Sequence, residues 1–204
     1  MMTALIVGNG EVSEKIKPLL PENAYVICAD GGFRHMDKLG LTPDIIIGDM
    51  DSVKADLHGE KTIVYPVRKD FTDSEIAVNY AINNGFSDLV LIGFTGTRTD
   101  HTLTNLFLLK GISERGARAE IIDEHNIIHY AEKENIIRGK KGDIVSIIPI
   151  GGDVSGITTE GLDYPLFSET LEFGKGRGVS NVMTDDECRI TVKNGSALII
   201  QSKD

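Results

Sequence analysis

The sequence is poor in cysteine, has no long hydrophobic run and carries too few basic residues to balance its acidic ones. Cys28 and Cys188 are its two cysteines. Their separation matches no zinc or redox spacing, so we expect two buried thiols in a reducing cytosol. The first apolar stretch, from Ala4 to Val7, is too short for a signal peptide or a membrane span and lacks a basic flank. These features predict a soluble, cytoplasmic protein with no membrane partner.

The shortage of positive charge argues against nucleic acid as the main partner. The formal net charge is -10 at pH 7, whereas binding to a phosphate backbone relies on Lys and Arg. A small ligand that carries phosphate is not excluded, because a bound divalent cation can reverse the local charge. With 204 residues and 41% hydrophobic content, the chain has the size and composition of one large globular domain or two small ones.

The first 123 residues alternate between strand-like and helix-like patterns. Short apolar runs predict strands at residues 3–7, 25–29, 44–47, 62–65, 89–92 and 119–122. Helical patterns lie between them at residues 12–20, 33–39, 73–84 and 100–113. Such alternation is typical of parallel strands joined by crossover helices. We therefore predict an α/β domain over residues 1–123, with a mostly parallel, doubly wound sheet.

From residue 124 onward the pattern changes to short strands separated by glycine-rich turns. We expect these strands at residues 127–130, 136–138, 143–149, 154–158, 168–173, 187–192 and 196–201. No long helical period interrupts them. Several short strands at regular spacing predict an all-β antiparallel sandwich over residues 124–204.

Two carboxylates follow the predicted strand 44–47. Asp49 and Asp51 come directly after the β-branched run and Gly48. Because residues at i and i+2 of an extended chain point the same way, the two side chains should converge beyond the end of the strand. Such a pair is poorly tolerated without a cation, and carboxylate oxygens suit Mg²⁺. A solvated acidic turn is the alternative. The position of the two carboxylates after a strand favours a ligand site.

The segment from Lys69 to Glu75 opens the predicted helix 73–84. Thr72 and Glu75 have the spacing of a capping box, which explains much of the segment without any ligand. Capping does not require Lys69 and Asp70 just before it. A helix start that is both basic and acidic could hold a metal with Asp73 and a phosphate with Lys69.

A third polar segment follows the predicted strand 89–92 and runs from Gly93 to His101. Its glycines, Gly96 among them, would let backbone amides approach an anion, and Arg98 could add a phosphate contact. The Gly-Lys-Ser/Thr ending of a Walker loop is missing. The alternative makes Thr99 or Asp100 a helix cap and His101 a surface residue.

Asp30 follows the predicted strand 25–29 and precedes Gly31 and Gly32, so a fourth strand end carries a carboxylate. A plain turn explains this segment nearly as well. Parallel topology gathers successive strand ends on one edge of a sheet. Carboxylates clustered there beside an anion-binding loop predict a site for a metal-bound polyphosphate.

The ordered set of motifs resembles the thiamine pyrophosphokinase family. The resemblance spans nearly the whole chain and is carried by residues 29–32, 43–52, 70–73, 96–101, 161–166, 170–174 and 180–181. It implies an N-terminal catalytic domain that binds ATP, a C-terminal sandwich that binds thiamine, and a homodimer whose thiamine sites form between subunits. The expected reaction is pyrophosphoryl transfer from ATP to thiamine, yielding thiamine diphosphate and AMP.

The resemblance and the local patterns together give an expected set of site residues. Mg²⁺ is expected on Asp49, Asp51 and Asp73, which with Asp100 form the expected catalytic set. Thiamine is expected near Asp30, Ser180 and Asn181. ATP binding is assigned to Lys69, Asp70, Thr72, Gly96, Arg98, Asp100 and His101.

Two features depart from the family pattern. The chain has no Trp, although some family members place one against the thiamine rings, so another side chain must cover them. The residues after Gly32 are Phe33, Arg34 and His35, where Ala-Asn-Arg is common.

Three alternative functions stay open. A pyrophosphokinase could act on another alcohol, such as a hydroxymethylpterin. A nucleotide-sugar glycosyltransferase also uses Asp-x-Asp with a metal, although the loop around Arg98 speaks against it. A sensor would bind nucleotide or thiamine without turnover.

Overall fold

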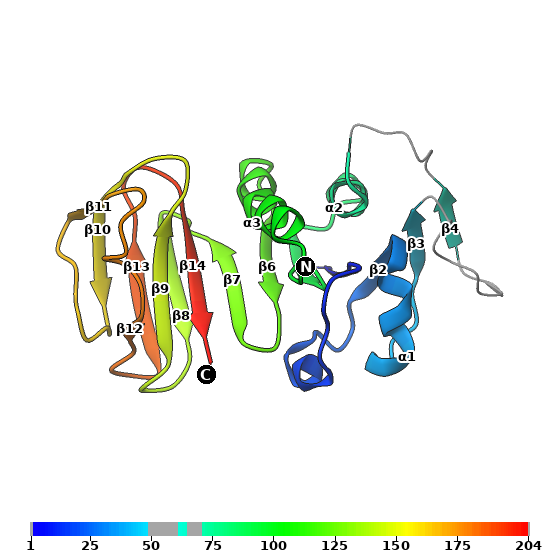
Figure 1. Cartoon of the computed structure of the whole chain (residues 1–204), viewed down its shortest axis with the longest axis horizontal. Coiled ribbons are helices and arrows are strands. Elements are labelled where there is room, and N and C mark those ends of the chain that lie inside the picture. Colours follow the sequence, from blue (N-terminus) through cyan, green and yellow to red (C-terminus); the bar gives the residue numbers. More distant parts are fainter. Residues whose placement is uncertain (1, 49–60, 65–70, 204) are drawn as a thin grey trace. The chain divides into compact units, whose positions relative to one another are not determined.

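The structure, a computed structural model, describes residues 2–48, 61–64 and 71–203, with backbone only at 61–64. The chain divides into two units, residues 1–124 and 125–204. Each unit is built from its own strands and is described by itself (Figure 1).

The first unit contains a six-stranded parallel sheet, as predicted. Every neighbouring pair in the order β6-β5-β1-β2-β3-β4 is parallel. The central strands are aliphatic runs, and Leu5, Ile6 and Leu91 have no exposed surface, as expected where both faces of a sheet are covered. The strands are β1 (Thr3–Val7), β2 (Tyr25–Ala29), β3 (Ile45–Gly48), β4 (Lys61–Val64), β5 (Asp88–Ile92) and β6 (Arg118–Ile122).

The strand order reverses between β1 and β5. From β1 the chain builds outward to β4, then returns so that β5 pairs with the other side of β1. In open parallel sheets, ligands bind beyond the carboxyl ends of the strands at such a reversal. The presence of helices on both faces, which a doubly wound sheet requires, stays a prediction.

In the part of the chain that the structure describes, five helical segments lie between these strands. They are η1 (Glu14–Leu19), η2 (Asp30–His35), α1 (Met36–Leu39), α2 (Asp73–Asn83) and α3 (Thr99–Glu114). The predicted helix 12–20 is a short 3-10 helix, with Pro18 inside it and Ser13 as its N-cap. Proline cannot donate an intrahelical hydrogen bond, which is consistent with this short segment. Within the described residues, no helix is long and apolar enough to cross a membrane.

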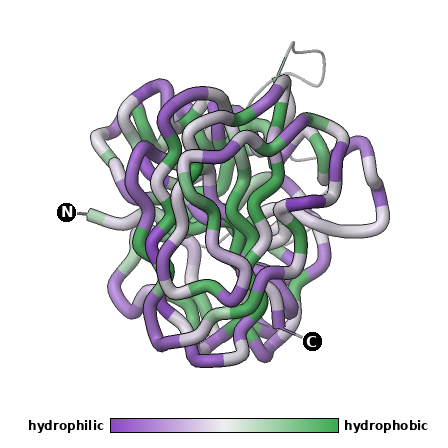
Figure 2. The backbone as a smooth tube through the Cα atoms, turned by 90° about the vertical axis from the view of Figure 1, so that its left-hand side faces the viewer, coloured by the Kyte–Doolittle hydropathy of each residue, from purple (hydrophilic) through white to green (hydrophobic). Residues whose placement is uncertain are grey.

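The second unit is a sandwich of two antiparallel sheets, with strand orders β12-β9-β14-β7 and β11-β10-β13-β8. One cluster of buried residues joins the sheets and includes Val145, Ile157 and Ile199. Figure 2 shows hydrophobic stretches along the strands and hydrophilic ones along the outer loops. The strands are β7 (Asn126–Tyr130), β8 (Glu134–Arg138), β9 (Ile144–Pro149), β10 (Val154–Glu160), β11 (Glu169–Leu171), β12 (Asn181–Val182), β13 (Glu187–Thr191) and β14 (Ala197–Ser202). The two-residue strand β12 was not predicted.

Candidate functional site

A cleft of about 540 Å³ opens in the first unit beyond the ends of β1, β2 and β5. It therefore lies at the reversal of strand order, where a ligand site is expected. Its walls come from the loops after these strands and from the start of α2. The lining residues are 9–11, 29–30, 34, 72–74, 93–98, 101–102 and 105.

Two of the cleft loops are joined to each other by backbone hydrogen bonds. The Gly10 amide donates to the Gly93 carbonyl at 2.7 Å, and the Glu11 amide donates to the Thr95 carbonyl at 2.9 Å. A Cβ placed on Gly10 would lie 2.2 Å from the Thr95 oxygen. The loop after β1 can approach the loop after β5 this closely because position 10 has no side chain.

Polar side chains of α3 hold the loop after β5. The Gly96 amide donates to Thr102 Oγ1 at 3.2 Å, and buried Asn105 Nδ2 donates to the Phe94 carbonyl at 2.8 Å. The helix begins at Thr99, and its N-cap residue is Arg98, which makes no side-chain capping bond. The alternative in which Thr99 or Asp100 caps this helix is therefore wrong.

Arg98 and Asp100 form a two-pronged ion pair on the surface. Arg98 Nε donates to Asp100 Oδ1 at 3.2 Å, and Nη2 donates to Oδ2 at 2.6 Å. The Arg98 hydrogen bond and the His101 amide lower the pKa of Asp100 to about 2, and the same pair raises the pKa of Arg98. Asp100 therefore stays ionised near neutral pH. Arg98 and His101 line the cleft, whereas Asp100 is not among its lining residues.

The start of α2 combines a structural cap with a cleft carboxylate. Thr72 Oγ1 accepts from the Glu75 amide at 3.2 Å, and Glu75 Oε2 accepts from the Thr72 amide at 2.7 Å. The predicted capping box is confirmed. Thr72 and Asp73 also line the cleft, so capping and a place at the site are compatible.

Asp30 lines the cleft where the chain leaves β2. Its φ of 45° is in the left-handed region, which costs a residue with a Cβ some strain. The end of β3 lies beside it, because a Cβ on Gly48 would be 3.0 Å from the Asp30 Cα. The predicted site residues Asp49, Asp51, Lys69 and Asp70 lie outside the described residues.

No group of three or more His, Cys, Asp or Glu in the described ranges could hold a metal by itself. In those ranges, the cleft offers the carboxylates of Glu11, Asp30 and Asp73. All are hard oxygen donors, which fit Mg²⁺ better than a soft or nitrogen-preferring metal. A Mg²⁺ site that uses Asp73 agrees with this chemistry.

Asn9, Glu11 and Arg34 are among the cleft residues that sequence reasoning missed. Asn9 lies between two glycines directly after the apolar run 4–7, and Glu11 follows the second of them; this short turn was the available signal for both. Arg34 was noted in the sequence only as one of the residues after Gly32 that depart from the family pattern. Its position four residues after Asp30, on the loop side of β2, was the available signal.

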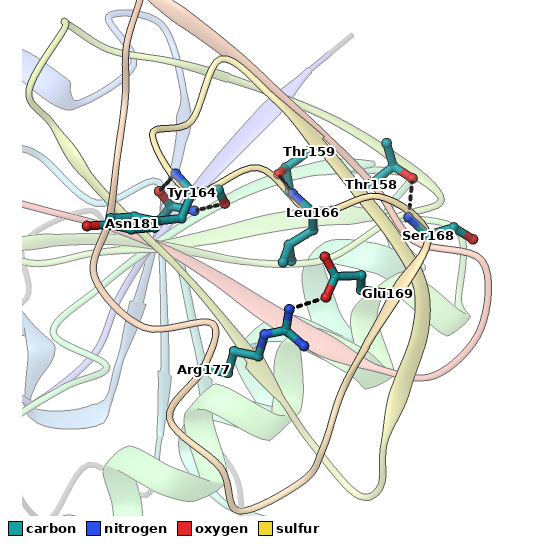
Figure 3. Close-up of polar contacts among 8 residues, drawn as sticks. All are labelled: Thr158, Thr159, Tyr164, Leu166, Ser168, Glu169, Arg177 and Asn181. Carbon is teal, nitrogen blue, oxygen red and sulfur yellow. Dashed lines mark hydrogen bonds and ion pairs between the residues drawn. The ribbon is translucent and has the colours of Figure 1, made fainter.

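The expected thiamine residues Ser180 and Asn181 lie in the second unit. The Ser180 amide donates to Ser146 Oγ at 2.9 Å. The Asn181 side chain binds the backbone of Tyr164 twice, accepting from its amide at 3.0 Å and donating to its carbonyl at 2.8 Å (Figure 3). It also accepts from the Val182 amide at 2.9 Å. The side-chain amide of Asn181 thus fixes the loop before β11.

The far side of the same loop is fastened to β10. The Leu166 amide donates to Thr159 Oγ1 at 2.8 Å, and the Ser168 amide donates to Thr158 Oγ1 at 3.1 Å (Figure 3). Leu166 is buried in the sandwich core, whereas Tyr164 is 70% exposed. The loop is therefore held from two sides and presents the Tyr164 ring to its surroundings.

Comparisons with known proteins agree with these two units. A thiamine pyrophosphokinase from Bacillus subtilis is 27% identical over the full length of both chains, and thiamine pyrophosphokinase 1 from Arabidopsis thaliana is 29% identical over 96% of this chain and 84% of the relative. The crystal structure of a thiamin pyrophosphokinase from Geobacillus thermodenitrificans is 26% identical, with a TM-score of 0.85 over 100% of this chain and 98% of the other. The crystal structure of a thiamine pyrophosphokinase from Bacillus subtilis superimposes on this chain with a TM-score of 0.89, at 24% identity and 99% coverage of both chains.

The models of two protein families match in succession along the chain. The model of the thiamin pyrophosphokinase catalytic domain matches residues 16–121, and that of the thiamin pyrophosphokinase vitamin B1 binding domain matches residues 125–199. The first match falls in the parallel-sheet unit with the cleft, and the second falls in the sandwich. The chain belongs to the thiamine pyrophosphokinase family.

Proposed function

We propose that this protein transfers the pyrophosphoryl group of ATP to thiamine and releases thiamine diphosphate and AMP. The observation that carries the proposal is a catalytic-domain match over the unit that holds the cleft, followed by a vitamin B1 binding match over the sandwich. The cleft supplies Arg98 from the loop before α3 and Asp73 from the start of α2, which suits a charged phosphate chain and a cation.

ATP is assigned to the cleft of the first unit. Gly96, Arg98, Thr72 and His101 line it, and Lys69 and Asp70 complete the proposed ATP set. Asp100 belongs to this set through Arg98, which it holds by two hydrogen bonds. A carboxylate with a pKa of about 2 is a weak base. Its contribution is therefore to fix the guanidinium rather than to remove a proton.

Mg²⁺ is assigned to Asp49, Asp51 and Asp73. Asp73 lies in the cleft, and β3 ends at Gly48 beside Asp30, one residue before Asp49. A bound Mg²⁺ neutralises charge on the phosphate oxygens and helps to orient them. The net charge of -10 is then compatible with a polyphosphate substrate.

The chemical step forms one bond and breaks another. The hydroxyethyl oxygen of thiamine attacks the β-phosphorus, and the bond from that phosphorus to the oxygen of the α-phosphate breaks, with the electron pair leaving on AMP. The hydroxyl proton passes to a carboxylate at the site, for which Asp30 is placed within the cleft. Arg98 holds phosphate oxygens in line, since such transfers depend on positioning and charge neutralisation.

Thiamine is assigned to Ser180 and Asn181 of the second unit, and its alcohol is assigned to Asp30 of the first unit, at sites that the proposed homodimer forms between subunits. The protein is further proposed to be a cytoplasmic homodimer, with helices on both faces of its parallel sheet. Light scattering coupled to size exclusion would give the mass of the assembly. A monomer of 22.2 kDa would contradict the dimer.

The decisive experiment is incubation with ATP, Mg²⁺ and thiamine, followed by mass detection of thiamine diphosphate and AMP. Asp73→Asn should abolish turnover, since the cleft loses a proposed metal ligand. Asp37→Asn is the matched control, because Asp37 also lies in the first turn of a helix but is exposed and not among the cleft residues. Full activity of Asp73→Asn at saturating Mg²⁺ would contradict the metal assignment.

The same assay separates the alternatives. A hydroxymethylpterin offered in place of thiamine should give no product, and a nucleotide sugar should give no nucleoside diphosphate. ATP binding without AMP release from any acceptor would indicate a sensor and would overturn the proposal.

A further inference from the structure

Arg34 reaches into the cleft from η2 and is anchored there by backbone oxygens. Its Nη2 donates to the carbonyl of Gly10 at 3.0 Å and also to that of Asn9. Its Nε lies 3.2 Å from His35 Nε2. Arg34 is among the residues that line the cleft, and the carbonyls that hold it belong to the loop after β1. The guanidinium is therefore kept in place beside the nucleotide site.

The charge of Arg34 is balanced differently from that of Arg98. Arg98 is paired with Asp100 through two hydrogen bonds. In the part of the chain that the structure describes, the partners of Arg34 are two carbonyls and an imidazole, and none is a carboxylate. Carbonyl dipoles orient a guanidinium without cancelling its charge. Arg34 therefore keeps a full positive charge for an incoming anion.

His35 makes two contacts that one nitrogen cannot satisfy at once. Its Nε2 lies 2.9 Å from the Gly10 carbonyl, a contact that needs a proton on Nε2. The Arg34 Nε–H needs a lone pair on the same atom. When Nε2 carries the proton and donates to Gly10, the Arg34 Nε–H is released for another acceptor. Arg34 is exposed and lines the cleft, so a ligand in the cleft can supply the acceptor that replaces His35.

We propose that Arg34 binds a phosphate group of the nucleotide in this cleft, with the Asn9 and Gly10 carbonyls as the groups that position its guanidinium. The identity of the ligand as a nucleotide rests on the proposed function. Phosphate oxygens are strong acceptors for guanidinium N–H groups. Within the described ranges, Nη1 donates to no protein group, so its two N–H donors are available to the same ligand.

The test compares binding of ATP and adenosine by the full chain, measured by titration calorimetry in the presence of Mg²⁺. Arg34→Ala should weaken ATP roughly 10- to 100-fold, as expected for loss of a charged hydrogen bond. It should leave adenosine within about twofold, because adenosine has no phosphate. Arg34→Lys should restore part of the ATP affinity, since Lys keeps the charge but not the planar fork.

Lys38→Ala provides the matched control. Lys38 lies on α1, donates to the Val12 carbonyl at 2.8 Å and is not among the cleft residues. Its removal deletes one positive charge close to Arg34 in sequence, so it reports the effect of net charge alone. We expect ATP affinity to change by less than about twofold, because screening weakens charges at a distance.

Three results would overturn the assignment of Arg34. They are unchanged ATP affinity in Arg34→Ala, an equal loss of ATP and adenosine affinity, and a loss as large in Lys38→Ala. The equal loss would identify Arg34 as a structural tie between η2 and the loop after β1. If the wild-type chain binds ATP but forms no thiamine diphosphate, the proposed function fails. The ratio of ATP to adenosine affinity still decides the role of Arg34.

Discussion

Removing the Asn181 side chain should loosen the loop that carries Tyr164. Asn181→Ala deletes two hydrogen bonds to the Tyr164 backbone, at 3.0 and 2.8 Å, and one to the Val182 amide at 2.9 Å. Each such bond contributes about 0.5–1.5 kcal/mol to stability. Tyr164 is 70% exposed, so water replaces part of the loss. We expect the free energy of unfolding to fall by about 2 kcal/mol, which corresponds to roughly 4–8 °C in Tm for a chain of this size.

The effect on the reaction should be confined to thiamine. Asn181 acts on the loop of the second unit, whereas the cleft assigned to ATP lies in the first. We therefore expect the KM for thiamine to rise about 5- to 30-fold, which corresponds to about one to two kcal/mol, with the KM for ATP unchanged. Asn181→Asp is the closest control, since it keeps the acceptor for two amides and loses the donor to the Tyr164 carbonyl.

Hydrogen exchange distinguishes a positioning role from a direct contact. If Asn181 holds the loop, the amides of residues 161–168 should exchange faster in Asn181→Ala, and thiamine should bind more weakly in parallel. Unchanged exchange and unchanged Tm with a complete loss of thiamine binding would refute the reasoning. Asn181 would then contact thiamine itself, and its bonds to Tyr164 would have little influence.

Four further predictions concern separate parts of the chain. Gly10→Ala should destabilise the cleft by about 1–3 kcal/mol in urea unfolding, because its Cβ would meet the Thr95 carbonyl. A Cβ on Gly111 in α3 would meet nothing within 4 Å, so Gly111→Ala should raise the free energy of unfolding by about 0.5–1 kcal/mol. Equal effects of the two glycine substitutions on stability would contradict this reasoning. Burial lowers the pKa of His129 to about 4, so the unfolded chain binds a proton before the folded chain does as the pH falls. The free energy of unfolding should therefore decrease as the pH falls from about 6.5 to about 4, by up to about 3 kcal/mol. His129→Gln should flatten this pH dependence, as measured by unfolding at a series of pH values. Thr72→Ala should cost about 1 kcal/mol through its lost cap, as read from Tm, and no loss would contradict the capping box.

Strand positions were predictable because their signal is local. The aliphatic run of β1 predicts residues 3–7, and β1 (Thr3–Val7) has those bounds. The capping box of Thr72 and Glu75 needs only a spacing of three residues, and both of its hydrogen bonds are present. Features determined by neighbouring residues can be read from the sequence, and the gathering of strand ends then follows from parallel topology.

The buried face of α3 cannot be read from residue spacing alone. Leu103, Leu106 and Phe107 share one face of the helix by their spacing, but Leu103 is 47% and Phe107 is 53% exposed. The buried residues of the helix are Asn105, Leu109 and Ile112. Two apolar stripes run along this helix, and spacing alone does not say which one faces the sheet. The choice is made by tertiary contacts, including the bond from Asn105 to the Phe94 carbonyl.

The roles of Arg34 and Asn181 depend on partners that are distant in sequence. The carbonyls of Asn9 and Gly10 that hold Arg34 lie 25 and 24 residues away, and Tyr164 is 17 residues from Asn181. A motif gives the type of side chain at a position but not the acceptors it meets after folding. For Asn181 the fold uses the amide internally, so a residue expected to touch substrate acts first on the backbone. For Arg34 the fold supplies only neutral partners among the described residues, and this leaves its charge for the ligand.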